Sequence, residues 1–420
     1  MRFGAPEALD ADTSRDGDEG GPAMPSRELK FEVFDADNHM YETAEALTKF
    51  LPAEYKGVVD YIDVHGRTKL AVRGLITEYI PNPTFSVVAS PGAQEEYFKI
   101  GNPEGKSRRE IMRPMPASPA FREPGPRLEL MDELGIDRAM MYPTLGSLIE
   151  ERMRDDPDLT AATVHALNQW MLEQWSFNYE NRIFATPVIT PGLADNAVAE
   201  LEWALEHGAK AVLMRPAPAW GYQGPRSFAL PEFDPYWKLL EESGTLLVIH
   251  SSDSGYQRYV NEWEGVRGEW TPFAAQSNFG LLTNHFRPIE DMVSSLIGHG
   301  VVFRFPEARI AIVENGSGWV RPMVERLQDA YEKAPRGSFP EDPLVAFRRT
   351  IRVHPFHEED PVGLTKLVGV DNILFGSDYP HPEGMSDPIS YVDELSALPE
   401  GDVAKIMGGN LAKLLKVTAA

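Results

Sequence analysis

The sequence contains no cysteine among its 420 residues. Disulfides, thiolate zinc sites, iron–sulfur clusters and thiol catalysis are therefore excluded, and histidine and carboxylates are the strong metal ligands that remain. An excess of positive charge is also absent, because 40 Lys and Arg stand against 64 Asp and Glu, a formal net charge of −24. Such a surface repels phosphate backbones and anionic membranes, so we expect no nucleic acid and no membrane as a partner.

Long apolar runs are missing as well. No run reaches the roughly 18 to 20 residues needed to span a bilayer, and residues 1–25 are rich in Asp, Gly and Pro without the apolar segment of a signal peptide. We therefore expect a cytoplasmic protein. Residues 1–28 have too little apolar content to fold, and we predict that they form a disordered tail.

Beyond that tail, short apolar runs alternate with longer segments of helical period, which is the pattern of βα units around a parallel sheet. The predicted helices include 158–179, 194–207, 234–243, 288–300, 319–333 and 387–395. Eight strands are predicted, at 31–37, 138–142, 183–189, 209–214, 246–250, 310–314, 351–354 and 373–377.

Eight βα units in this length favour a closed (β/α)₈ barrel of the TIM type, which needs roughly 250 residues. We expect one barrel domain over 29–420, with insertions at about 52–126 after strand one and 251–286 after strand five. An open doubly wound sheet is the alternative, but the first strand is not followed by a glycine-rich phosphate turn.

The end of the first predicted strand is unusually polar, with the run Asp35-Ala36-Asp37-Asn38-His39. Because side chains alternate along an extended segment, Asp35, Asp37 and His39 are expected on one face. A turn rich in Asp and Asn would explain the same run without a ligand.

Other predicted strands also end in residues of metal-binding type. Strand five ends in His250, strand six in Glu314, and strand eight in Ser377-Asp378-Tyr379-Pro380-His381. In a barrel, the carboxyl ends of all strands point into one pocket. Burying these polar groups without partners is costly, and a shared cation would satisfy them together.

These motifs resemble the amidohydrolase superfamily, and in particular its amidohydrolase-2 branch of metal-dependent hydrolases and nonoxidative decarboxylases related to aminocarboxymuconate semialdehyde decarboxylase. The resemblance covers about residues 31–415, and Gly376-Ser377-Asp378-Tyr379-Pro380 is its most specific part. It implies that Asp378 binds the metal and handles a proton, that His250 is a ligand, and that His39 matches the second histidine of the family's first motif.

The chain departs from the family pattern in three places. Asp37 stands where the first histidine is common, and Glu314 replaces the histidine that acts as general base in decarboxylase relatives. Arg215 ends strand four, where some relatives have a carboxylated bridging lysine. The usual bridge between two metals is therefore missing, and Glu314 becomes a general base, a ligand or a bridge.

We predict a metal site formed by Asp37, His39, His250, Glu314 and Asp378, with Asp35 as an extra ligand or an orienting group. Asp378, Glu314 and His381 are the predicted catalytic residues. The set suits one or two divalent ions per chain, either zinc, manganese or iron. Arg215 is the predicted substrate-binding residue, since its guanidinium matches a carboxylate or phosphate, although a salt bridge at the barrel rim explains it as well.

The leading functional hypothesis is metal-assisted hydrolysis of a small or medium-sized, apolar or aromatic carbonyl or carboxylate substrate. Nonoxidative decarboxylation is the first alternative. A carboxylate-bridged di-iron oxygenase, such as a hydroxylase of secondary metabolism, is the second, and a catalytically inactive barrel used as a scaffold is the third. The sequence is compatible with a homo-oligomer and leaves the substrate open.

Overall fold

The computed structural model describes residues 28–77, 82–267, 277–283 and 286–417. The predicted tail, 1–28, lies outside this part of the chain except for its last residue. Seven parallel strands form the barrel wall in two sheets, in the orders β1-β7-β8 and β14-β13-β12-β9. Their bounds are β1 (Phe34–Met40), β7 (Arg138–Pro143), β8 (Ile183–Ala185), β9 (Ala211–Met214), β12 (Leu246–His250), β13 (Arg309–Val313) and β14 (Ile351–Val353).

The two sheets are joined on both sides, so the wall closes. On one side Val188, just beyond β8, bridges Leu213 of β9. On the other, the segment 373–379 runs between β14 and β1: it bridges Val353 at its start and Asn38 at its end, and the Phe375 carbonyl accepts a hydrogen bond of 2.9 Å from the Ala36 N–H. This segment takes the place of the eighth strand, and the predicted TIM-type barrel is confirmed.

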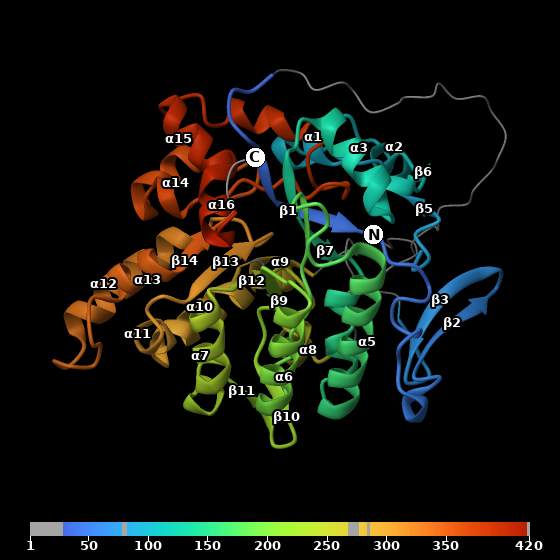
Figure 1. Cartoon of the computed structure of the whole chain (residues 1–420), viewed down its shortest axis with the longest axis horizontal. Helices are drawn as coiled ribbons and strands as arrows, with labels where there is room; N and C mark the ends of the chain where they lie inside the picture. Colours follow the sequence, from blue (N-terminus) through green and yellow to red (C-terminus); the bar gives the residue numbers. More distant parts are fainter. Residues whose placement is uncertain (1–27, 78–81, 268–276, 284–285, 418–420) are drawn as a thin grey trace.

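Helices surround the barrel (Figure 1). The longer ones are α3 (Pro124–Leu134), α5 (Pro157–Trp175), α6 (Ala194–Glu206), α7 (Asp234–Ser243), α8 (Gln257–Glu264), α10 (Arg287–Gly298), α12 (Val320–Lys333), α13 (Pro343–Thr350) and α14 (Pro361–Val368). Shorter ones are α4 (Glu150–Met153), α9 (Asn278–Thr283), α11 (Val301–Arg304), α15 (Glu400–Ala404) and α16 (Asn410–Leu415). Among the described helices, none combines the length and the apolar character that crossing a bilayer requires.

Local sequence explains why these elements form. The β12 run Leu-Leu-Val-Ile-His is buried at every position, as expected for a parallel strand covered on both faces. Helix α7 has a proline in its first turn and ends at Gly244, whose φ of 68° is a left-handed conformation that glycine adopts without strain. Helix α14 is capped at its N-terminus by Asp360, whose side chain accepts a hydrogen bond from the Gly363 N–H.

Much of the chain between β1 and α3 belongs to small elements outside the barrel wall. It contains β2 (Val59–Val64), β3 (Arg67–Val72), β4 (Leu75–Thr77), β5 (Val87–Val88), α1 (Glu95–Ile100), α2 (Arg108–Met112) and β6 (Met115–Pro116). The β2–β3 hairpin projects from one edge of the molecule (Figure 1). Between β12 and α10, the described part of the second predicted insertion forms α8 and α9; residues 268–276 and 284–285 of that insertion lie outside the described residues.

The predicted strand 373–377 is not a regular strand in the structure, and three other predicted elements also differ clearly. The first strand runs from 34 to 40 instead of 31 to 37, because the His39 N–H donates to the Tyr379 carbonyl and so extends the pairing past the Asp-Asn run. The predicted strand 183–189 is regular only to Ala185. The predicted helix 387–395 is a 3₁₀ helix over Pro388–Asp393.

Candidate metal centre

Strand β1 brings Asp37 and His39 into the cluster of potential metal ligands. The expected alternation of side chains is interrupted within the same strand, close to Asp35. The register of β1 against β7 shifts between Asp35 and Asn38, and the Asn38 Nδ2 donates to the Asp35 Oδ2 at 2.5 Å. Asp35 and Asn38 are therefore partners on the same side, and the expectation that Asp35, Asp37 and His39 share a face was wrong. A bulge inserts a residue into the pairing and breaks the two-residue period.

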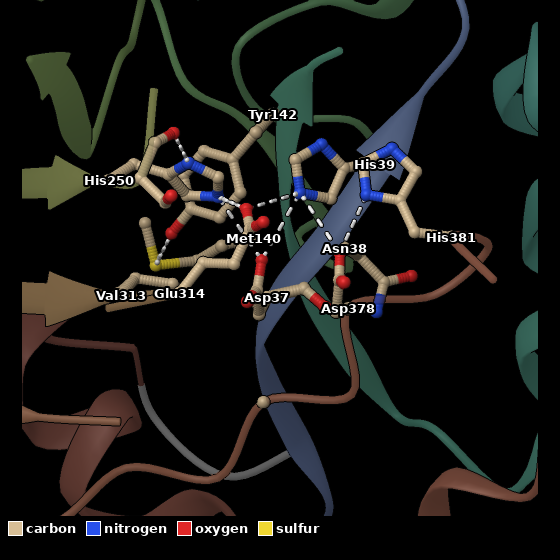
Figure 2. Close-up of polar contacts among 12 residues, drawn as sticks. Asp37, Asn38, His39, Met140, Tyr142, His250, Val313, Glu314, Asp378 and His381 are labelled. Carbon is tan, nitrogen blue, oxygen red and sulfur yellow. Dashed lines mark hydrogen bonds and ion pairs between the residues drawn. The ribbon is translucent and has the colours of Figure 1, made fainter. Parts of the chain in front are cut away.

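His250 and Glu314 come from adjacent strands. His250 pairs with Val313 in the β12–β13 register, so Glu314 follows directly beside it. The His250 Nε2 lies 3.0 Å from the Glu314 Oε2 and 3.3 Å from the Asp37 Oδ1, as Figure 2 shows. On the other side of the ring, the His250 Nδ1 is 2.8 Å from the Ser251 carbonyl. A carbonyl only accepts, so Nδ1 carries the proton and the Nε2 lone pair faces the carboxylates.

Asp378 and His381 complete the cluster from the segment that closes the barrel. The Asp378 Oδ1 is 3.4 Å from the His39 Nε2 and 2.7 Å from the His381 Nδ1. The His381 Nε2 contacts the Thr144 Oγ1 at 3.1 Å, and that hydroxyl donates its proton to the Met40 carbonyl. The Thr144 Oγ1 must then accept a hydrogen bond from the His381 Nε2. On the other side of the ring, the His381 Nδ1 and the Asp378 Oδ1 share one proton.

Two of the clustered residues have strained backbones. Glu314 has a φ of 51° and Asp378 a φ of 55°, both in the left-handed region that residues other than glycine seldom occupy. Such conformations cost about 1–3 kcal/mol each and persist where the surrounding structure enforces them. Here the strain turns two carboxylates toward the same point, which is typical of a functional site.

Burial and mutual charge shift the pKa values of the cluster in opposite directions. Burial opposes ionisation of Asp37, but the adjacent His250 and His39 imidazoles hold its pKa well below the usual range. Burial likewise disfavours the charged form of His39, yet the adjacent Asp37 and Glu314 carboxylates raise its pKa to about 9. Burial, with Glu314 and Asp37 nearby, raises the pKa of Asp378 well above its ordinary value.

The side chains fit a divalent cation. Ligand atoms of Asp37, His39, His250 and Glu314 all lie within 4.8 Å of one another. Among the described residues, the buried Asp37 Oδ2 and His39 Nε2 have no hydrogen-bond partner, although three carboxylate oxygens surround the His39 Nε2 at 3.3 to 3.6 Å. A shared metal ion would provide a partner for these buried atoms, which have no hydrogen-bond partner.

Asp35 supports the metal centre through hydrogen bonds to the backbone that carries the potential ligands. Its carboxylate accepts from the Asp37 N–H at 3.0 Å and from the Ser377 N–H at 2.9 Å, so it ties the first strand to the closing segment. It belongs to none of the groups of potential ligands among the described residues. Of the two roles predicted for Asp35, the structure therefore favours orientation.

His354 and Glu383 are neighbours of the centre that the motif analysis did not assign to it. The His354 Nδ1 lies 3.4 Å from the Asp37 Oδ2 and accepts from the Glu314 N–H at 3.3 Å. Glu383 offers an oxygen to a second group, with Glu314 and Asp378, and burial together with Glu314 raises its pKa to about 8. The position of Glu383, five residues after Asp378 on the same loop, was the available signal.

Gly376 is packed so closely that a methyl group does not fit. A Cβ at this position would lie 2.6 Å from the Asp37 Cβ and 2.8 Å from the His354 Nε2. We expect Gly376→Ala to displace Asp37, to weaken metal binding and to cost about 1–3 kcal/mol of stability, as overpacking typically does. Calorimetric unfolding and metal titration would measure both effects; Gly401→Ala, where a Cβ meets nothing within 4 Å, is the control. Equal metal affinity in Gly376→Ala and wild type would contradict this packing.

Arg215 lies outside the metal cluster. It follows β9, and its Nη1 donates to the Glu151 Oε2 at 2.9 Å and to the Asp253 carbonyl at 2.7 Å. The structure thus places Arg215 in a salt bridge, while its predicted contact with a substrate stays a prediction. The other predicted site residues are all brought together: Asp37, His39, His250, Glu314, Asp378 and His381.

A closed parallel barrel with histidines and carboxylates at the carboxyl ends of its strands defines a class of metal-dependent enzymes. The family model described as Amidohydrolase matches residues 62–417. The chain belongs to this family, in its amidohydrolase-2 branch. Its activity is accordingly of the metal-dependent amidohydrolase type.

Solved structures agree with this assignment. An amidohydrolase from Mycobacterium avium subsp. paratuberculosis K-10 is 36% identical, with a TM-score of 0.86 over 92% of this chain and 100% of the other. A manganese-bound dihydroxybenzoic acid decarboxylase from Polaromonas sp. JS666 is 16% identical, with a TM-score of 0.57 over 93% and 98% of the two chains. A manganese-bound 5-carboxyvanillate decarboxylase from Novosphingobium aromaticivorans is also 16% identical, with a TM-score of 0.58 over 94% and 99%. The two decarboxylases share the fold.

Proposed function

We propose that the protein is a metal-dependent hydrolase that acts on a neutral carbonyl group of a small organic molecule. The observation that carries the proposal is the anionic ligand set. Asp37, Glu314 and Asp378 lie around two imidazoles, and Glu383 adjoins them. A single divalent ion carries two positive charges, which do not exceed the negative charge of these carboxylates. The centre therefore has no surplus of positive charge to attract a carboxylate substrate. A neutral ester, amide or lactone does not meet that obstacle.

The residues divide the work of hydrolysis. Asp37, His39, His250 and Glu314 would hold the ion, which when bound lowers the pKa of water and polarises a carbonyl. Asp378 faces the same point, and its Oδ1 is 2.7 Å from the His381 Nδ1. This pair takes a proton from the attacking water and returns it to the leaving group. Thr144 keeps the His381 ring in the orientation that the transfer requires.

Nonoxidative decarboxylation is the second candidate. It is favoured by the dihydroxybenzoic acid and 5-carboxyvanillate decarboxylases that share this fold and were solved with manganese. In such a reaction the shared proton of Asp378 and His381 would go to carbon instead of to a leaving group. The more anionic ligand set of this chain is the reason to place hydrolysis first.

Labelled water separates these reactions. The metal-loaded protein is incubated in H₂¹⁸O with neutral aromatic esters, amides and lactones and, separately, with hydroxybenzoates. The masses of the products are then measured by mass spectrometry. Hydrolysis places one ¹⁸O in the acid product. Release of carbon dioxide from hydroxybenzoates, with no turnover of the neutral compounds, would overturn the proposal in favour of decarboxylation.

Metal analysis tests the centre itself. We expect elemental analysis of the purified protein to find one divalent ion per chain, as zinc or manganese, and its removal by a chelator to abolish hydrolysis until the ion is restored. Two irons per chain together with oxygen uptake would replace hydrolysis by the oxygenase alternative. Absence of any metal would favour a scaffold.

A further inference from the structure

A small cavity lies on the same face of the barrel as the metal centre, but over other strands. It is lined by Glu150 and Arg154 of the α4 region, Thr190 beyond β8, and Arg215 and Trp220 beyond β9. None of these five residues belongs to the groups of potential metal ligands described above. The cavity is therefore separate from the centre in its residues, although both open at the carboxyl ends of barrel strands.

The lining of this cavity contains two guanidinium groups, of Arg154 and Arg215, and one carboxyl group, of Glu150. The buried Glu151 carboxylate pairs with three guanidinium groups: Arg215 at 2.9 Å, Arg154 at 3.1 Å, and Arg258. Glu150 is the acidic residue in the lining; burial raises its pKa, while Arg215, 3.8 Å away, acts in the opposite direction. A carboxyl held closer to its neutral form repels an anion less.

Two hydrogen-bond donors in the lining have nothing to bind. The Trp220 ring centroid lies 5.3 Å from the Arg154 Cζ and 4.9 Å from the Arg258 Cζ. Among the described residues, the buried Trp220 Nε1 and the buried Arg154 Nε have no hydrogen-bond partner. Both atoms only donate, so a ligand that satisfies them must be an acceptor.

We propose that this cavity binds the anionic group of a small organic molecule, a carboxylate or a phosphate. The donors of Arg154 and Trp220 and the cationic side chain of Arg215 match such a group, and arginine is well suited to planar oxyanions. The chain as a whole has a net charge of −24 and repels anions. A cavity whose lining contains more guanidinium than carboxyl groups is therefore a place where an anion can bind selectively.

The site is linked to the metal centre through one loop. The Arg215 Nη1 donates to the Asp253 carbonyl at 2.7 Å, and Asp253 lies three residues after His250 on the loop that follows β12. The proposal goes beyond the hydrolase assignment and does not depend on it, because the anion is held by residues that take no part in the proposed hydrolysis.

Calorimetric titration of the metal-loaded protein with benzoate and, separately, with phenyl phosphate tests the site. Saturating acetohydroxamate, a small metal ligand, is present so that neither probe can bind to the metal. We expect at least one probe to bind, and Arg154→Gln and Trp220→Phe each to weaken it about tenfold or more, as loss of a hydrogen bond to a charged group does. The tighter of the two probes identifies the oxyanion.

Matched controls separate the cavity from general effects. Arg326→Gln changes an exposed arginine of α12, and Trp263→Phe changes an exposed tryptophan of α8; both are expected to bind like wild type. If Arg154→Gln does not fold by circular dichroism, Arg154→Lys, which keeps the charge but loses Nε, is measured in its place. No binding of either probe to wild type, or equal binding by Arg154 and Trp220 variants and wild type, would overturn the proposal.

Discussion

Changing Asp37 to asparagine is expected to remove the metal from the centre. The carboxylate is fully buried, lies 3.3 Å from both the His39 and the His250 Nε2, and is held ionised by its histidine neighbours. The amide is isosteric but neutral, so the ligand set loses its most deeply buried charge. We expect metal affinity to fall by more than about 100-fold, beyond the 10- to 100-fold typical of residues that only orient ligands.

Competition with a fluorescent chelator would measure this affinity, and elemental analysis would show the metal retained after dialysis. Asp132→Asn is the matched control, because Asp132 is an exposed carboxylate in a surface ion pair and its loss changes the net charge equally. We expect the control to keep its metal. Wild-type affinity in Asp37→Asn, His250→Gln and Asp378→Asn alike would remove the basis for this site.

Changing Asp378 to asparagine is expected to lower kcat by about 10²–10⁴-fold, the usual contribution of a positioned acid or base. Asparagine preserves the shape at this strained position but cannot exchange a proton with His381. The fall should appear in kcat at full metal occupancy, so turnover is measured with saturating metal on the substrate that the labelled-water experiment identifies.

The metal content of the same Asp378→Asn sample distinguishes loss of proton transfer from loss of the ion. Asp371→Asn, a change in an exposed ion pair with Lys405, serves as the control and should leave kcat unchanged. If Asp378→Asn turns over like wild type with its metal bound, Asp378 is not the proton-transfer residue. His381→Gln should give a smaller loss, because Asp378 itself remains.

The fold could be predicted because its signals are local and repeated. Buried strands such as Leu246–His250 read as apolar runs, and helices such as α7 carry their own start and stop residues. Strand ends were informative for a physical reason: His250 and Glu314 are polar groups directly after apolar runs, and such groups need partners. Strands in one barrel place those partners together.

The remaining features depend on pairing that a linear pattern does not contain. The bulge between Asp35 and Asn38 is fixed by bonds to Ser377, some 340 residues away, so alternation alone assigned Asp35 to the wrong face. The contact of His354 with Asp37 arises only when β14 joins the sheet, so a linear pattern does not reveal it. Glu383 lies in a loop, where apolar residues do not recur with the spacing of a helix or a strand, so its position relative to the metal centre could not be inferred.

The closure of the barrel by the segment 373–379 has a consequence for how the protein matures. Asn38 and Tyr379 form a bridge between opposite ends of the sequence, and Asp378 meets His39 only through that contact. During synthesis, domains assemble as their parts emerge, and here the segment that closes the barrel around the metal centre emerges last. Metal capture should therefore be a late, post-translational event, and a ribosome-bound chain that ends before residue 378 should bind the ion poorly.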